Sequence, residues 1–112
     1  MTDALVAFLK ARCDELQAQQ EDPFTAWHSP DCEAVPDNWG RETGACNCGV
    51  PARTLREVEA KRRILRAHEK WCEGRCEAKH PEGGFDAAHY WSIKALAAVY
   101  ADHPDYLPEW RP

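Results

Sequence analysis

Six cysteines and five histidines lie within 112 residues, and most of them fall into two groups. Thiolate sulfur and imidazole nitrogen are the ligands that structural zinc sites use, four to an ion. The first group joins His28 and Cys32, four residues apart, to the pair Cys46 and Cys48, which Gly49 follows. Two thiolates on a tight turn can grip one ion, and the other pair can complete a tetrahedron. We therefore predict a zinc site at these four His and Cys residues.

The second group holds His68, Cys72 and Cys76 at four-residue intervals, with His89 further along the chain. Closed zinc sites commonly combine two ligands on a loop with a further ligand from the first turn of a helix. The sequence therefore predicts a second site at these four residues, with His80 as a substitute for either histidine. In the competing interpretation, His89 and Cys72 are core residues. The expected cofactor is thus zinc, as one or two structural ions.

Whether the cysteines bind metal or form disulfides depends on the cellular compartment of the protein. The N-terminus has no basic segment followed by an apolar run, so it is not typical of a signal peptide. No stretch reaches the ~20 apolar residues of a membrane span. We therefore expect a cytoplasmic protein with no membrane partner, and the reducing cytoplasm favours metal over disulfides. A thiol redox sensor that pairs Cys46 with Cys48, or Cys72 with Cys76, is a weaker alternative.

Several common catalytic motifs are absent from the sequence. It contains no His-Glu-x-x-His metalloprotease motif, no Gly-x-Ser-x-Gly nucleophile turn, no phosphate-binding glycine loop and no Pro-Cys-x-x-Cys deaminase signature. A thiol and imidazole pair such as Cys72 with His68 is weak support for catalysis inside a metal-like cluster. We therefore expect a protein that is not an enzyme.

Three helices are expected to carry the candidate ligands. Apolar residues at 3.6-residue spacing predict helices over 3–20, 51–70 and 87–102. Proline and glycine crowd 23–50, which predicts a loop with room for a minor β-hairpin at most, and 72–85 is a second predicted loop. The fold class is therefore mainly α: a small three-helix domain with long loops, stapled by structural zinc.

The length favours a single domain spanning 1–112. Its core is expected from apolar stripes on the first and third helices. The stripe residues are Leu5, Phe8, Leu9, Cys13, Leu16, His89, Ile93, Leu96 and Tyr100. The aromatic residues of the tail that begins at Pro104 are expected to fold back onto the helices.

Charge is distributed unevenly along the chain. The net charge is −5, from 14 basic and 19 acidic residues, whereas the helix over 51–70 is basic. Zinc combined with a basic helix is a recurring form of nucleic-acid-binding protein. The residues that would contact phosphate are Arg53, Arg56, Arg63, Arg66 and Lys70. The acidic remainder would repel phosphate, so we expect a protein partner in preference to nucleic acid.

Two motifs give the chain a specific resemblance. Residues 56–64 read Arg-Glu-Val-Glu-Ala-Lys-Arg-Arg-Ile, and residues 100–106 read Tyr-Ala-Asp-His-Pro-Asp-Tyr. Together with the N-terminal helix and the tryptophan-containing middle, they resemble a family of small proteins of unknown function from actinobacteria and their phages. The resemblance covers the whole chain and implies an intracellular, phage- or prophage-encoded protein. We expect a non-enzymatic, zinc-stabilised interaction or regulatory protein.

Overall fold

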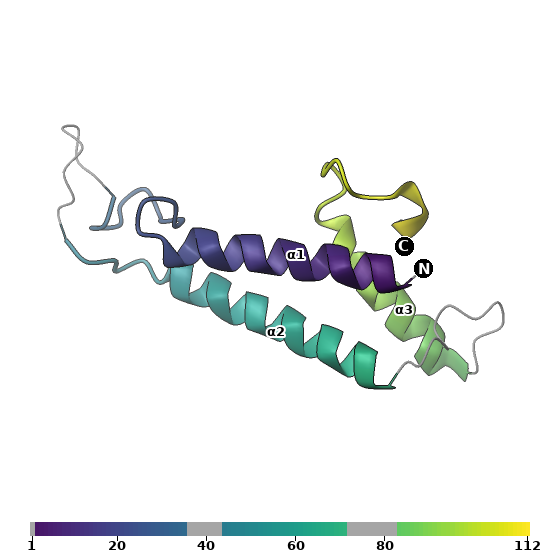
Figure 1. Cartoon of the computed structure of the whole chain (residues 1–112). Helices are drawn as coiled ribbons and strands as arrows, with labels where there is room; N and C mark the ends of the chain where they lie inside the picture. Colours follow the sequence, from purple (N-terminus) through teal and green to yellow (C-terminus); the bar gives the residue numbers. More distant parts are fainter. Residues whose placement is uncertain (1, 36–43, 72–82) are drawn as a thin grey trace. The chain divides into compact units, whose positions relative to one another are not determined.

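The computed structural model of the chain describes residues 2–35, 44–71 and 83–112, which form three α-helices and a short 3₁₀ helix (Figure 1). The helices are α1 (Thr2–Glu21), α2 (Val50–Trp71), α3 (Gly83–Ala98) and η2 (Pro108–Trp110). The described residues contain no strand, which confirms the mainly α class and leaves no hairpin in the described part of 23–50. No helix in these ranges combines the length and apolar character needed to cross a bilayer.

The first two helices match their predicted bounds to within one residue at each end, but the third does not. α3 begins at Gly83 and ends at Ala98, four residues before the predicted start and end. A helical glycine costs only about 1 kcal/mol, so the glycines near the start do not exclude a helix there. After α3 the backbone tightens into turns, since the N–H of Tyr100 donates to the carbonyl of Ala97 at 2.9 Å. Such short-range bonds end the α-helical ladder earlier than the apolar stripe predicts.

The chain divides into two compact units. Unit 1 comprises Met1–Cys13 and Ala60–Pro112, and unit 2 comprises Asp14–Glu59. The core of unit 1 draws buried side chains from all four helices: Leu5, Val6, Phe8, Leu9, Leu65, Ile93, Ala97 and Trp110. The spacing of three or four residues along α1 places its members on one face, as the sequence predicts. Cys13 is only 1% exposed, which agrees with its predicted role in packing.

The C-terminal tail contributes aromatic rings to the core of unit 1. Trp110 is 4% exposed, and its ring centre lies 5.1 Å from that of Phe8. Tyr100 and Tyr106 each approach the same phenylalanine ring edge-on, with ring centres 6.1 Å away. Edge-on aromatic pairs of this kind are favourable beyond the apolar area they bury. The prediction that the tail aromatics fold back is therefore confirmed.

Unit 2 contains the end of α1, the chain that follows it and the beginning of α2. α1 ends where Asp22 redirects the backbone, because its Oδ1 accepts the N–H of Phe24 at 2.8 Å and its carbonyl accepts that of Ala26 at 2.9 Å. An Asp side chain that bonds to the backbone two residues on forms an Asx turn, which competes with helix. The turn leads into the loop that holds the first pair of candidate ligands.

Candidate metal centre

Four side chains from two loop segments of unit 2 converge on one point. The Nδ1 atom of His28 lies 3.5 Å from the Sγ of Cys32, 3.4 Å from that of Cys46 and 3.6 Å from that of Cys48. The sulfur of Cys46 lies 3.8 Å from that of Cys32 and 3.7 Å from that of Cys48. All four ligand atoms lie within 4.8 Å of one another. The structure thus brings together the whole first group predicted from the sequence.

These distances correspond to the edges of a zinc tetrahedron. With Zn–S bonds of about 2.3 Å and a Zn–N bond of about 2.0–2.1 Å, two sulfur ligands lie about 3.8 Å apart and a sulfur and a nitrogen about 3.6 Å apart. The sulfurs are also much too far apart for a disulfide bond of about 2.05 Å, and none of the four cysteines in the described ranges forms one. The four residues therefore lie close enough together to bind one metal ion.

Backbone turns fix the position of Cys32. Its own N–H donates to the carbonyl of Ser29 at 2.9 Å, and its carbonyl accepts the N–H of Val35 at 3.0 Å. The next residue, Glu33, donates its backbone N–H to the Oδ1 of Asn47 at 3.1 Å. This last bond ties the first loop segment to the residue between the two other cysteines. The sequence analysis did not identify Asn47 as a member of the site.

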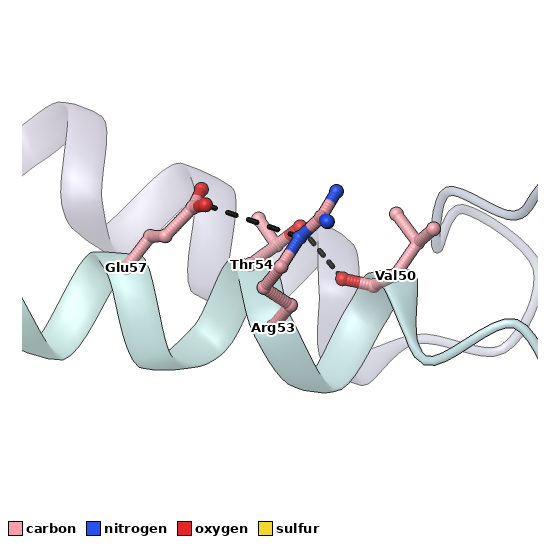
Figure 2. Close-up of polar contacts among 4 residues, drawn as sticks. All are labelled: Val50, Arg53, Thr54 and Glu57. Atoms are coloured by element: carbon pink, nitrogen blue, oxygen red, sulfur yellow. Dashed lines mark hydrogen bonds and ion pairs between the residues drawn. The ribbon is translucent and has the colours of Figure 1, made fainter.

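Gly49 directs the chain from the cysteine pair into α2. Its φ of 73° lies in the left-handed region, which a residue with a Cβ adopts only at a cost. Its carbonyl accepts the N–H of Arg53 at 3.0 Å, which is the first helical bond of α2. Figure 2 shows the turn that follows, where the hydroxyl of Thr54 donates to the carbonyl of Val50 at 2.8 Å and Arg53 pairs with Glu57 at 4.0 Å. The cysteine pair therefore lies immediately before a well-bonded helix start.

The start of α2 favours the thiolate form of Cys48. The pKa of this thiol is lowered from 9.0 to about 7, and the N–H of Val50 is the largest influence on it. Burial opposes the shift, while the N–H of Ser29 and the thiols of Cys32 and Cys46 also contribute to it. The first N–H groups of a helix have no intrahelical acceptor and carry the positive end of its dipole. A helix N-terminus thereby prepares one sulfur for metal binding.

The other two thiols experience opposing influences. Burial acts most strongly on Cys32 and raises its pKa, but three backbone N–H groups outweigh it and the pKa is lowered overall. Those groups belong to Ala34, Asn47 and Cys48. For Cys46 the largest influence is the N–H of Gly49, which lowers the pKa, yet burial and the two neighbouring thiols raise it overall. Three thiolates so close together repel one another, and a divalent cation would relieve that repulsion.

The four ligands differ in their access to solvent. Cys32 is 5% exposed, while His28 and Cys48 are half-buried and Cys46 is exposed. A pair of turns thus encloses one side of the cluster, and the other side is open to ions and reagents in solution.

A family model of proteins of unknown function (DUF6221) matches residues 2–112 of this chain. The chain belongs to that family. No curated protein and no solved structure matches the chain significantly. Membership of DUF6221 names no activity, so the site itself has to carry the functional argument.

The second predicted group lies only in part within the described residues of this DUF6221 member. His68 of α2 and His89 of α3 meet in unit 1, with their rings stacked at 4.9 Å between centres and 23° between planes. The Nδ1 of His68 lies 2.9 Å from the Nε2 of His89, a hydrogen-bond distance. His68 is 5% exposed. The predicted ligands Cys72 and Cys76, and the substitute His80, lie outside the described residues.

The basic side chains of the alternative nucleic-acid interface all lie on α2 and are exposed. They are Arg53, Arg56, Arg63, Arg66 and Lys70. Within the helix, the Nε of Arg53 pairs with Glu57. An exposed position is what both phosphate binding and a solvated helix face require, so exposure does not decide between them.

Two further polar groups were not predicted from the sequence. Gln20, on the last turn of α1, is 4% exposed and accepts the N–H of Trp27 at its Oε1 atom, 3.0 Å away. In unit 1, the guanidinium of Arg12 contacts the imidazole of His103, whose Nδ1 accepts the N–H of Asp105 at 3.0 Å. Both contacts join residues that no short spacing pattern connects, so the sequence carried no signal for them.

Proposed function

We propose that this protein is a small zinc-stabilised interaction module without enzymatic activity. One observation carries the proposal: the imidazole of His28 and the thiols of Cys32, Cys46 and Cys48 all lie within 4.8 Å of one another, and the separations of 3.4–3.8 Å among them match the edges of a zinc tetrahedron. The set of one nitrogen and three sulfurs is typical of structural zinc and fits softer ions better than magnesium or calcium. The proposal places the protein in a reducing compartment such as the cytoplasm, where the thiols stay reduced.

The ligand count supports a structural role for the ion. A catalytic zinc keeps one position open for water or substrate, whereas four protein ligands close the coordination shell. The described segments that supply the ligands contain turns and no helix or strand, and two of the ligands lie directly before α2. A zinc ion would therefore replace the apolar core that a loop of this composition lacks.

Exposed aromatic side chains support the interaction role. Phe24 is 90% exposed and Trp27 is 49% exposed, and both lie on the loop that leads into His28. Large apolar side chains that remain in solvent are typical anchors of protein interfaces. We propose that the metal holds this loop in shape for a protein partner, in a regulatory role of a bacterium or its phage.

The test is native mass spectrometry of the purified, reduced protein, compared with its mass under denaturing conditions. We expect a native mass that is higher by at least one zinc ion. The variant Cys48→Ser should lose that ion, while Cys13→Ala, which removes a buried thiol of unit 1, should keep it. A reduced native protein that carries no metal would overturn the proposal.

A second ion is a further part of the proposal. The contact between His68 and His89 joins two of the four residues predicted for it, and Cys72 and Cys76 would supply the remaining ligands. Cobalt substitution tests this arrangement, because tetrahedral thiolate sites absorb in the visible range. We expect two equivalents of cobalt in the original protein and one in the variant His89→Ala. A single equivalent in both proteins would limit the chain to one site.

The exposure of five basic side chains on α2 supports a second candidate, a zinc-stabilised nucleic-acid-binding protein. Contacts to phosphate release counterions, so such binding weakens steeply with salt. Fluorescence anisotropy with a labelled DNA duplex and a labelled single-stranded RNA would show this. Binding that falls with salt and is lost in the double variant Arg63→Ala with Arg66→Ala, but not in Arg111→Ala, would favour this candidate.

A further inference from the structure

A pocket of about 310 Å³ lies in unit 2 beside the candidate metal centre. Gln20 and Glu21 line it from the end of α1, and Pro23 and Ala26 line it from the turn that follows. The ligand residues His28 and Cys46 also contribute to its wall. Volumes of this size are at the lower end of those that hold ligands, and they accommodate a few residues of a peptide.

The side chain of Gln20 brings a buried donor to this pocket. The Oε1 of Gln20 accepts the N–H of Trp27, which fixes the orientation of the amide and leaves its Nε2 as a donor. That nitrogen is buried and has no hydrogen-bond partner among the described residues. A buried donor without an acceptor carries a free-energy cost, which an incoming carbonyl oxygen would remove.

The surroundings of the pocket are strongly acidic. Unit 2 contains ten acidic and three basic residues, a net charge of −7, in a chain whose total is −5. The segment 21–35, which runs along the pocket, contains four acidic residues and no lysine or arginine. Its acidic residues are Glu21, Asp22, Asp31 and Glu33, and all four are exposed. A surface of one sign attracts a partner of the other sign and fixes its orientation.

We propose that this pocket binds a basic, extended peptide segment of a partner protein. A backbone carbonyl of the segment accepts the unused N–H of Gln20, and a lysine or arginine pairs with Glu21 or Asp22. Phe24 and Trp27 lie beside these groups in the sequence and offer exposed apolar surface to the neighbouring residues of the segment. This inference rests on the proposed function, because the metal would hold the loop on which these residues lie.

The test uses the zinc-loaded full chain and a library of random dodecapeptides displayed on phage. Peptides enriched on the immobilised protein are sequenced, synthesised with a fluorescent label and titrated by anisotropy. We expect lysine and arginine to be enriched over the starting library and binding to weaken as salt rises. Enrichment of peptides without basic residues, or no enrichment, would overturn the docking proposal.

Matched variants distinguish binding at the pocket from a general attraction of basic peptides to an acidic protein. Gln20→Met removes the side-chain amide, and with it both the unused donor and the oxygen that accepts the N–H of Trp27, in a side chain of similar length. The double variant Glu21→Gln with Asp22→Asn removes two charges but keeps their acceptor oxygens. Each should raise the Kd by on the order of tenfold or more. Asp14→Asn with Glu15→Gln makes the same charge change on exposed positions of α1 outside the pocket, and the Kd should stay within about twofold. Equal effects of the two charge variants would overturn the proposal.

Zinc content is measured for every variant by native mass, so two kinds of failure can be distinguished. A protein that holds zinc but selects no basic peptide contradicts the docking proposal and leaves the zinc-stabilised fold in place. A protein that holds no zinc contradicts the proposed function, and the docking proposal fails with it. A Gln20→Met protein that keeps its zinc and its melting temperature shows that any loss of peptide binding comes from the missing amide and not from unfolding.

Discussion

At the scale of single residues, the candidate site depends on backbone N–H groups as much as on its ligands. The N–H of Val50 is the first of α2, and it stabilises the thiolate of Cys48 more than any other group does. Asn47 accepts a backbone N–H from the opposite segment and so holds the two halves of the cluster together. Metal-binding thiols generally need such outer contacts, because the contacts orient the sulfurs and reduce their mutual repulsion.

The pKa of Cys48 gives the first prediction. In the metal-free protein, its alkylation by iodoacetamide should reach half of its maximal rate near pH 7, because the thiolate is the nucleophile and its pKa is lowered from 9.0 to about 7. A thiol whose pKa is lowered on folding stabilises the folded protein fully at a pH above its ordinary pKa of 9.0. This contribution to the free energy of unfolding is lost as the pH falls through about 7. Peptide mass spectrometry after brief labelling measures the rate at each pH.

A backbone substitution tests the cause of that shift. Val50→Pro removes the N–H that faces the sulfur, and proline is tolerated at the first position of a helix. The pH at which alkylation of Cys48 reaches half of its maximal rate should then rise toward the ordinary thiol pKa of 9.0. Val50→Ala, which keeps the N–H, should leave this midpoint near pH 7. Equal midpoints in the two variants would assign the shift to the N–H of Ser29 and the neighbouring thiols instead.

Gly49 gives a second prediction at this scale. Its φ of 73° makes Gly49→Ala costly by about 1–2 kcal/mol, whereas Gly49→Asn should cost less because asparagine tolerates the left-handed region. Both variants keep all four ligands. Urea unfolding of the zinc-loaded proteins measures the difference. An alanine variant as stable as the original would show that this turn relaxes to another backbone conformation.

At the scale of elements, the sequence predicted the features that depend on residues a few positions apart, namely the ligand pairs and the two longer helices. The ligand set of the first site follows from His28 and Cys32 at one interval and Cys46 and Cys48 at another, and the structure brings all four together. The two longer helices follow from apolar periodicity in the same way. Within each ligand pair and along each helix, the residues that determine these features lie within a few positions of one another.

The features that the sequence did not predict depend on contacts between distant residues or on small energy differences. The burial of Gln20 results from a bond to Trp27 across the turn at the end of α1, and no periodicity marks that bond. The start of α3 at Gly83 was missed because glycine is a weak helix former, although surrounding residues can override its preference. Spacing identified His68 and His89 as possible partners, but only the fold shows that their rings stack.

The tail provides a prediction at the element scale. Trp110→Ala should destabilise the protein by about 3–5 kcal/mol, because this ring is 4% exposed and packs against Phe8 in the core of unit 1. Trp91→Ala is the matched control, since that ring on α3 is 58% exposed, and its effect should stay within about 0.5 kcal/mol. Urea unfolding followed by circular dichroism measures both. Equal losses would mean that the tail does not close this core.

At the scale of the whole molecule, the two units have different sources of stability. Unit 1 has a core of buried aliphatic and aromatic side chains drawn from four helices. In unit 2, the described chain between α1 and α2 is held by turns and by the ligand cluster, and the buried residues there include the ligand Cys32 itself. An apolar core does not depend on metal, whereas thiolates that repel one another are stabilised in a cluster by the cation that they bind. The two units should therefore respond differently to a chelator.

Metal removal tests that difference through hydrogen exchange. After treatment with EDTA under reducing conditions, amides over 28–35 and 44–49 should exchange faster by on the order of a hundredfold, because the cross-link between these segments is lost. Amides of the core helices over 5–13 and 93–97 should change little, since the residues that form this core are ligands of neither proposed site. Zinc added back should restore the protection, and a Cys48→Ser protein should exchange like the metal-free form with or without zinc. Uniform acceleration across the chain would show instead that the metal supports the fold of both units, and unchanged exchange in the loops would show that backbone turns alone hold the ligands in place.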